Sequence, residues 1–287
     1  MRSWVAQRPL VSFYFLTLTF SWGYWVALLV QGLRVGPGSV AHFPGLLGPM
    51  FAAIAVTAMT GGREALHELF GRMLGLGPHW AVKLMLALSP LALGAVACIA
   101  IVLLGKPIPP MAAFTQVPGM PNNWPLAAVL LAVVVVNGFG EEVGWRGFLF
   151  ERLLLTHGRL RATLVVALLW SMWHLPLFWL NTGMAAMVGP VLIGWLFALL
   201  CGAFVLAQVY LATGHSILCV ALWHVAFNMM VSAGGSAGLP AAIVSTAVMV
   251  WGVIVAVVWW RTPRPLIGPE LLHHPTVQRE VVAHRGP

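Results

Sequence analysis

The sequence predicts an all-α, polytopic integral membrane protein with about eight transmembrane helices. Hydrophobic residues make up 60% of the 287 residues and charged residues only 8%, against about 25% charged residues in an ordinary soluble domain. The mean hydropathy of +0.92 agrees with this composition. Because a soluble fold of this length could not cover its surface with so few charges, the membrane class follows before any motif is considered.

Eight apolar runs are each long enough to cross a bilayer, which takes about 20 residues. Glycine, proline and charged residues separate them, as at Gly158. The predicted spans are 10–33, 43–60, 80–104, 125–151, 161–180, 188–212, 214–233 and 238–260. We expect one transmembrane domain over residues 1–262, with a motif-bearing core at about 125–233. The polar, proline-containing segment 263–287 is expected to be a disordered tail.

The basic residues predict the topology. If the N-terminus is cytoplasmic, the cytoplasmic side holds Arg2, Arg8, Arg63, Arg72, Lys83, Arg152, Arg159, Arg161, Arg261, Arg264, Arg279 and Arg285. Only Arg34 and Lys106 fall on the other side. The positive-inside rule therefore places both termini in the cytoplasm. The expected location of the protein is the inner or plasma membrane. The expected partner of these basic residues is the lipid bilayer, not a nucleic acid, because no basic cluster is interleaved with aromatic residues.

Two of the seven glutamates lie within an apolar run, whereas the other five, Glu151 among them, fall in or beside polar, loop-like stretches. An ionisable side chain at the bilayer centre costs about 2.5–3.5 kcal/mol, so such residues usually face a protein interior or a cavity. The polar residues inside the predicted spans are Asn137, Glu141, Glu142, Arg146, His174, His224 and Asn228. No role is predicted for the histidines near the predicted surfaces, which are His42, His67, His79, His157, His215, His273, His274 and His284.

The depths of these polar residues can be compared by counting from the cytoplasmic ends of their spans. Glu141 and His174 each lie about 13 residues inside, or roughly 20 Å at 1.5 Å per residue. His224 lies roughly 15 Å deep and Asn228 roughly 21 Å deep by the same count. Similar depths in three separate spans predict one shared site that opens toward the cytoplasm.

Spacing within each span suggests how the side chains are used. Glu142 and Arg146 are four residues apart, so a carboxylate and a guanidinium share one helix face and are expected to pair. Glu141 is offset by about 100° and faces the side of Asn137. His224 and Asn228 are also four residues apart and could serve one point. Glycines around the glutamates allow another backbone or a substrate to approach closely.

This set of residues is suited to hydrolysis. A buried carboxylate beside a histidine can hold and deprotonate a water, a role that fits Glu141 and His174. An imidazole and an amide can stabilise the resulting oxyanion, a role that fits His224 and Asn228. Alternatively, Glu141, His174 and His224 could bind a divalent metal such as zinc with an open position for water. Taken singly, each residue also has a structural interpretation, such as interhelical hydrogen bonding.

At these residues the sequence resembles the CPBP family, the CAAX proteases and bacteriocin-processing enzymes, also called Abi proteins. The family motif Glu-Glu-x-x-x-Arg is present as Glu141–Arg146, and His-x-x-x-Asn as His224–Asn228. The intervening motif Phe-x-x-x-His occurs as Trp170–His174, with tryptophan in place of phenylalanine, and we expect that replacement to leave the chemistry unchanged. The order and spacing match over about residues 137–230.

The resemblance implies an eight-helix intramembrane endopeptidase of the kind that includes the type 2 CAAX prenyl endopeptidase. It implies that Glu141 and His174 activate water, that His224 and Asn228 stabilise the oxyanion, and that Glu142 and Arg146 orient the site. The implied substrate is a membrane-associated protein or peptide, in some cases prenylated. Both metal-dependent and metal-free mechanisms are held for the family. The alternatives are a transporter, a membrane scaffold and a bacteriocin-immunity protein.

Overall fold

The computed structural model describes residues 2–36, 38–114, 116–117, 120–121 and 123–262, so the predicted tail, 263–287, lies outside the described residues. The first part of the chain forms α1 (Arg2–Gln7), α2 (Pro9–Val30), α3 (Phe43–Leu46), α4 (Gly48–Leu74), α5 (Trp80–Ala87) and α6 (Ser89–Leu103). The middle forms α7 (Met111–Phe114), α8 (Leu126–Val133), the π-helical turn η1 (Val134–Phe139), α9 (Gly140–Gly144), a second π-helical turn η2 (Trp145–Phe150) and α10 (Glu151–Trp173). The last part forms α11 (Leu177–Leu180), α12 (Thr182–Ala185), α13 (Pro190–Ala212), α14 (Ile217–Ser232), the 3-10 turn η3 (Gly234–Ser236) and α15 (Leu239–Arg261).

The predicted all-α membrane class agrees with this structure, in which no strand occurs among the described residues. Large apolar side chains lie on the outer surface, such as Val30 at 83% exposure, Leu103 at 82% and Ile193 at 73%. Exposure of such an apolar surface to water is unfavourable, whereas its contact with lipid is favourable. The chain is therefore an integral membrane protein.

The number of spans differs from the predicted eight. Within the described residues, four helices are long and apolar enough to cross a membrane, namely Pro9–Val30, Leu126–Leu180, Pro190–Ala212 and Leu239–Arg261. The bent pair α5 and α6, inclined at 48°, makes a fifth if it counts as one span. The predicted run 43–60 is divided between α3 and the first half of α4, the second half of α4 is rich in charge, and α14 has only 16 residues. Eight spans and cytoplasmic termini therefore stay predictions.

Gly158 explains part of this difference. The stretch Leu126–Leu180 counts as one helix of 55 residues, which would be about 80 Å long if straight, against about 30 Å of hydrocarbon. Gly158 has φ 67° and ψ 167°, which is not helical and which a residue with a Cβ rarely adopts. The helix thus breaks at the point where the sequence predicts a boundary between two spans.

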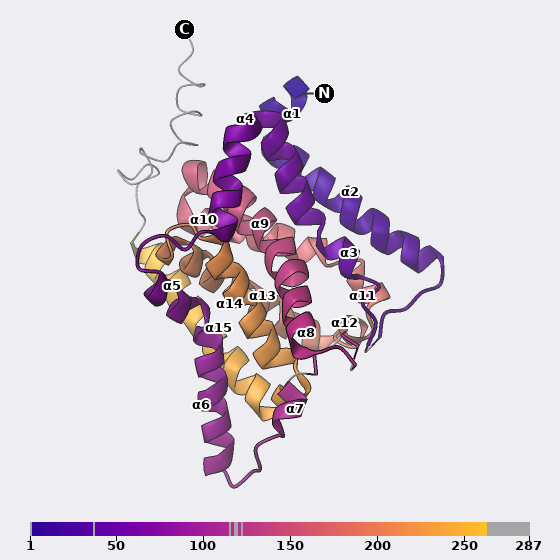
Figure 1. The fold of residues 1–287 in the computed structure, drawn as a ribbon, viewed down its shortest axis with the longest axis vertical. Helices are drawn as coiled ribbons and strands as arrows, with labels where there is room; N and C mark the ends of the chain where they lie inside the picture. Colours follow the sequence, from indigo (N-terminus) through magenta and orange to yellow (C-terminus); the bar gives the residue numbers. More distant parts are fainter. Residues whose placement is uncertain (1, 37, 115, 118–119, 122, 263–287) are drawn as a thin grey trace.

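The connections gather at two ends of the bundle. At one end, Arg159 donates to the Thr262 carbonyl at 2.7 Å, and Ser216 donates to the Gly75 carbonyl at 3.1 Å. We call this the arginine-rich end, and its basic residues include Arg63, Arg72, Lys83, Arg152, Arg159, Arg161 and Arg261. At the opposite end, the backbone of Val35 pairs with Leu180 and that of Gly234 with Gln116. In Figure 1 the N-terminus and α1 lie at the top, and α7 and α12 lie lower in the view.

Glycines let the glutamate-bearing helix α9 pack directly against its neighbours. A Cβ on Gly144 would lie 2.5 Å from Pro49 Cβ of α4, and one on Gly140 would lie 3.0 Å from the Leu46 carbonyl oxygen. On the other side, a Cβ on Gly147 would meet Ile217 of α14 at 2.5 Å. The close approach predicted from these glycines is therefore made by other parts of the protein, and it fixes α9 in the centre of the bundle.

Candidate active site

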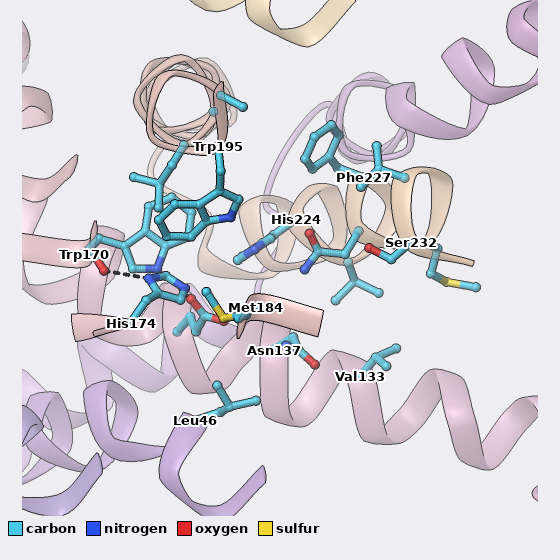
Figure 2. A pocket seen from close by; sticks show the side chains of 18 of the residues that line it. Leu46, Val133, Asn137, Trp170, His174, Met184, Trp195, His224, Phe227 and Ser232 are labelled. Carbon is cyan, nitrogen blue, oxygen red and sulfur yellow. Dashed lines mark hydrogen bonds between the residues drawn. The ribbon is translucent and has the colours of Figure 1, made fainter. Parts of the chain in front are cut away.

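One cavity of about 490 Å³ lies beside α9 and takes its walls from several helices. It is lined by polar residues that the sequence analysis singled out, namely Asn137, Glu141, His174, His224 and Asn228. Trp170 and His174 lie near one another, and His224 and Asn137 lie beside them around the same space (Figure 2). The structure thus brings together side chains from η1, α9, the end of α10 and α14. Their catalytic roles stay predictions.

Glu142 and Arg146 do not line this cavity but lie behind it. Arg146 Nη1 donates to Glu142 Oε1 at 2.9 Å, with the two side chains 1% and 0% exposed, so the predicted ion pair is present. The same oxygen accepts from His224 Nδ1 at 2.7 Å, a contact that the sequence analysis did not predict. Because Nδ1 is directed at this carboxylate, Nε2 is the ring nitrogen left for the cavity. Glu142 therefore holds both the Arg146 guanidinium and the His224 imidazole, and it orients the His224 ring.

Glu141 is 3% exposed and lies at the wall of the cavity. Its Oε2 accepts a hydrogen bond from Trp170 Nε1 at 2.7 Å. The Trp170 ring also lies under the Arg146 guanidinium, 4.6 Å from ring centroid to guanidinium carbon, which is a cation–π distance. A phenylalanine in this position has no N–H to donate. The replacement of the family's phenylalanine by Trp170 thus adds a hydrogen bond to Glu141, beyond the apolar exchange expected from the sequence.

His174 follows the last residue of α10 and is held by that helix. Its Nδ1 lies 2.7 Å from the Trp170 carbonyl oxygen, and since a carbonyl can only accept, Nδ1 carries the hydrogen. The rings of Trp173 and Trp195 pack against the imidazole, with centroids 4.9 and 5.3 Å away. The remaining nitrogen, Nε2, is then an acceptor when the ring is neutral, as required of a group that holds or takes a proton from water.

The metal-dependent alternative can be compared with the arrangement of these side chains. Within the described part of the chain, no three His, Cys, Asp or Glu side chains are grouped so that they could hold a metal ion. Glu141, His174 and His224 line the same cavity but do not form such a group as placed. No step of the chemistry below is therefore assigned to a metal, and zinc binding stays a prediction.

The sequence analysis missed His42, which also lines the cavity. His42 lies in the connection between α2 and α3, directly before α3, and burial lowers the pKa of its imidazole to about 4, so the side chain is neutral at pH 7. The conformation of this connection determines the position of His42. No local sequence pattern predicts that this side chain lines the cavity.

A second buried polar group, which we call the end cluster, lies at the arginine-rich end and consists of Arg72, Glu151, Tyr210 and His215. Glu151 is 2% exposed, and its Oε2 accepts from the Tyr210 hydroxyl at 2.7 Å and pairs with His215 Nδ1 at 2.8 Å. Arg72 Nη1 donates to the Tyr210 hydroxyl at 2.7 Å and lies 3.7 Å from Glu151 Oε2. The end cluster joins α4, α10, α13 and the turn before α14.

The fold and the cavity together define an integral membrane protein with an internal cavity lined by one carboxylate and three imidazoles. Residues 123–230 match the family model described as Type II CAAX prenyl endopeptidase Rce1-like, and this range contains all three motifs. A curated relative, CAAX prenyl protease 2 of Methanococcus maripaludis, is 36% identical over 53 residues. That alignment covers 18% of this chain and 19% of the relative's length. Over the matched residues the chain is similar to CPBP/Rce1-like proteins.

Proposed function

We propose that this protein is an intramembrane endopeptidase that hydrolyses a peptide bond of a membrane-associated protein or peptide. The observation that supports this proposal most strongly is the single cavity lined by Glu141, His174, His224 and Asn228. A structural ion pair or an isolated interior histidine would not require four such residues from three helices around one space. The match of residues 123–230 to the CAAX endopeptidase model supports the same function.

In the proposed reaction, water in the cavity attacks the carbonyl carbon of the scissile bond. Glu141 accepts a proton from this water, and His174 holds the water through Nε2. The carbonyl oxygen becomes an oxyanion, which His224 Nε2–H and the Asn228 amide stabilise. His224 must carry hydrogen on both nitrogens for this role, and the Glu142 carboxylate at Nδ1 favours that form. When the C–N bond breaks, Glu141 returns its proton to the leaving amine, which restores the enzyme.

The partner implied by this proposal is a substrate in or on the lipid bilayer. Apolar side chains such as Met184, Trp195 and Phe227 make up much of the cavity wall, which suits an apolar peptide. The family resemblance implies a substrate with a prenylated C-terminus. We include recognition of the lipid group of such a substrate in the proposal.

Replacement of Glu141 tests the proposal. Purified Glu141→Ala protein should lose cleavage of a prenylated CAAX-type peptide and of apolar test peptides, with unchanged thermal unfolding in detergent. Glu64→Ala, at an exposed glutamate of α4, is the matched control and should cleave normally. Turnover retained by Glu141→Ala would contradict the assignment. Solute flux in proteoliposomes without any cleavage by the unmodified protein would favour a transporter instead.

A further inference from the structure

The cavity wall contains polar side chains that the proposed reaction does not use. Among them are His42, in the connection between α2 and α3, and Asn137, in η1 one turn before Glu141. Asn181 also lines the cavity, but its side-chain oxygen accepts hydrogen bonds from two backbone N–H groups of α12, at 2.9 and 3.2 Å. That oxygen is therefore used within the protein, which leaves His42 and Asn137 to be explained.

His42 is held by its backbone and not by its ring. Trp25 Nε1 of α2 donates to the His42 carbonyl oxygen at 2.9 Å, and the Tyr24 hydroxyl donates to the preceding carbonyl, that of Ala41, at 3.0 Å. In contrast, Nδ1 of the His42 ring is buried and has no hydrogen-bond partner among the described residues. Such an atom is rare in a native fold and needs an explanation. The fold thus fixes the position of the ring and leaves its nitrogen for another group.

His42 and Asn137 belong to neighbouring parts of the cavity wall. Phe43, which follows His42, packs against an apolar cluster that includes Val133 of α8. Val133 lies one turn before Asn137 and also borders the cavity (Figure 2). The backbone of α3 packs directly against α9, the helix that carries the proposed base. Both side chains therefore lie in the part of the wall beside that base.

The chemistry of these two side chains matches a peptide backbone. A peptide that enters the cavity in extended form brings N–H and C=O groups that lose their bonds to water and need new partners. The low pKa of His42 keeps its imidazole neutral at pH 7, so the ring offers one donor and one acceptor. The Asn137 carboxamide likewise offers donors and an acceptor. Groups with both functions can satisfy both polar groups of a peptide bond.

We propose that His42 and Asn137 form a subsite that hydrogen-bonds the backbone amides next to the scissile bond. This inference rests on the proposed function, to which it adds two substrate-binding residues and the part of the substrate that they contact. Because backbone amides are common to all sequences, the subsite positions a peptide without selecting its side chains. The bonds are present before and during the attack of water, so they affect KM more than kcat.

His42→Leu removes both ring nitrogens and keeps an apolar side chain. With a prenylated CAAX-type peptide, it should raise KM about tenfold and change kcat by less than about twofold. His42→Asn returns a donor and an acceptor near the position of Nδ1 and should stay within about threefold of the unmodified protein. His67→Leu, at an exposed histidine of α4, is the matched control and should leave both constants unchanged. Asn137→Leu should raise KM as His42→Leu does, and it tests the subsite even if His42→Leu does not fold.

Ester substitution in the peptide shows whether the contact is to the backbone. An ester in place of one amide next to the scissile bond removes an N–H donor, and at one such position it should raise KM for the unmodified protein. In the variant that lacks the partner of this N–H, either His42→Leu or Asn137→Leu, the same ester should have no further effect. A merely structural role of both residues would give additive effects at every position.

Binding of the same peptide to Glu141→Gln protein separates the subsite from the proposed function. In this background His42→Leu should raise the Kd about tenfold. A Kd that depends on His42 in a protein that cleaves no peptide would contradict the proposed function and leave the subsite supported. Cleavage with KM and Kd unchanged in both leucine variants, additive ester effects at every position, or a lower kcat at constant KM would overturn the subsite.

Discussion

The cavity site and the end cluster are built from the same chemical parts but differ in access. Each has a buried glutamate beside a histidine and an arginine: Glu141 in one, Glu151 in the other. Glu151 directs one oxygen at both Tyr210 and His215, and it does not line the cavity beside α9. Glu141 accepts from Trp170 through Oε2 and lies on the cavity wall. One carboxylate is used by the protein itself, and the other is presented to a space that a substrate could fill.

This difference shows that burial of a carboxylate does not identify a catalytic residue. A glutamate surrounded by fixed donors stabilises the contact between helices, because its charge is compensated within the protein. Hydrolysis additionally requires room for water and a carbonyl group next to the carboxylate. The following variants test the difference, in order of decreasing expected effect.

Arg146→Met should have the largest effect. It leaves the buried Glu142 with only His224 as partner, and removal of one member of a buried ion pair costs about 3–5 kcal/mol. We expect a corresponding fall in the free energy of unfolding, measured in detergent with a chemical denaturant. Arg63→Met, at an exposed arginine of α4, is the control and should unfold normally. Equal stability of the two variants would show that the pair contributes little.

Asn228→Ala should affect catalysis without affecting the fold. Loss of one oxyanion donor lowers kcat by about 10²–10³-fold, and Asn228 is only partly buried, so the unfolding temperature should change little. Single-turnover cleavage gives the rate, and Ser171→Ala, outside the cavity, serves as the control. A normal rate in Asn228→Ala would remove this residue from the oxyanion site.

Tyr210→Phe tests the structural role of the end cluster. It removes the hydroxyl that bridges Arg72 and Glu151, which should lower the free energy of unfolding by about 1–3 kcal/mol. The folded fraction should keep its kcat, because Tyr210 does not line the cavity. A loss of kcat without a loss of stability would assign the end cluster to catalysis.

Trp170→Phe restores the family residue and should have the smallest effect. The ring is retained, but Glu141 loses the donor at 2.7 Å. A bond to a charged group is worth about 1.5–3 kcal/mol, and partial compensation by water in the cavity leaves an expected loss of about tenfold in kcat. Since Trp170 positions Glu141, KM should be nearly unchanged. An equal change in KM and none in kcat would instead indicate a role in substrate binding.

Much of the fold could be predicted because composition and apolar run length report directly on the membrane. The break at Gly158 was also predicted, from a glycine between polar neighbours. The number of spans was harder to predict, because residues 63–74 continue α4 beyond a non-helical Gly62. Whether such a charged extension is helical depends on tertiary contacts, such as burial of Leu69, and not on local hydropathy.

The candidate site was partly predictable because its residues are polar within apolar spans. Regular spacing predicted the Glu142–Arg146 pair, since i and i+4 positions share a helix face. The contact of His224 with Glu142 joins residues 82 positions apart and follows from packing that no local pattern shows. Glu151 was placed beside a loop for the same reason, because its partners come from three other segments.

The central claim is that Glu141 takes part in substrate hydrolysis, whereas Glu151 stabilises the fold. The most direct test is to compare Glu141→Gln with Glu151→Gln in purified protein, with peptide cleavage and unfolding measured on the same samples. Glu141→Gln should lose cleavage by at least about 10²-fold with near-normal unfolding, and Glu151→Gln should unfold more easily while its folded fraction cleaves normally. Normal cleavage by Glu141→Gln, or loss of cleavage by a stably folded Glu151→Gln, would contradict this account.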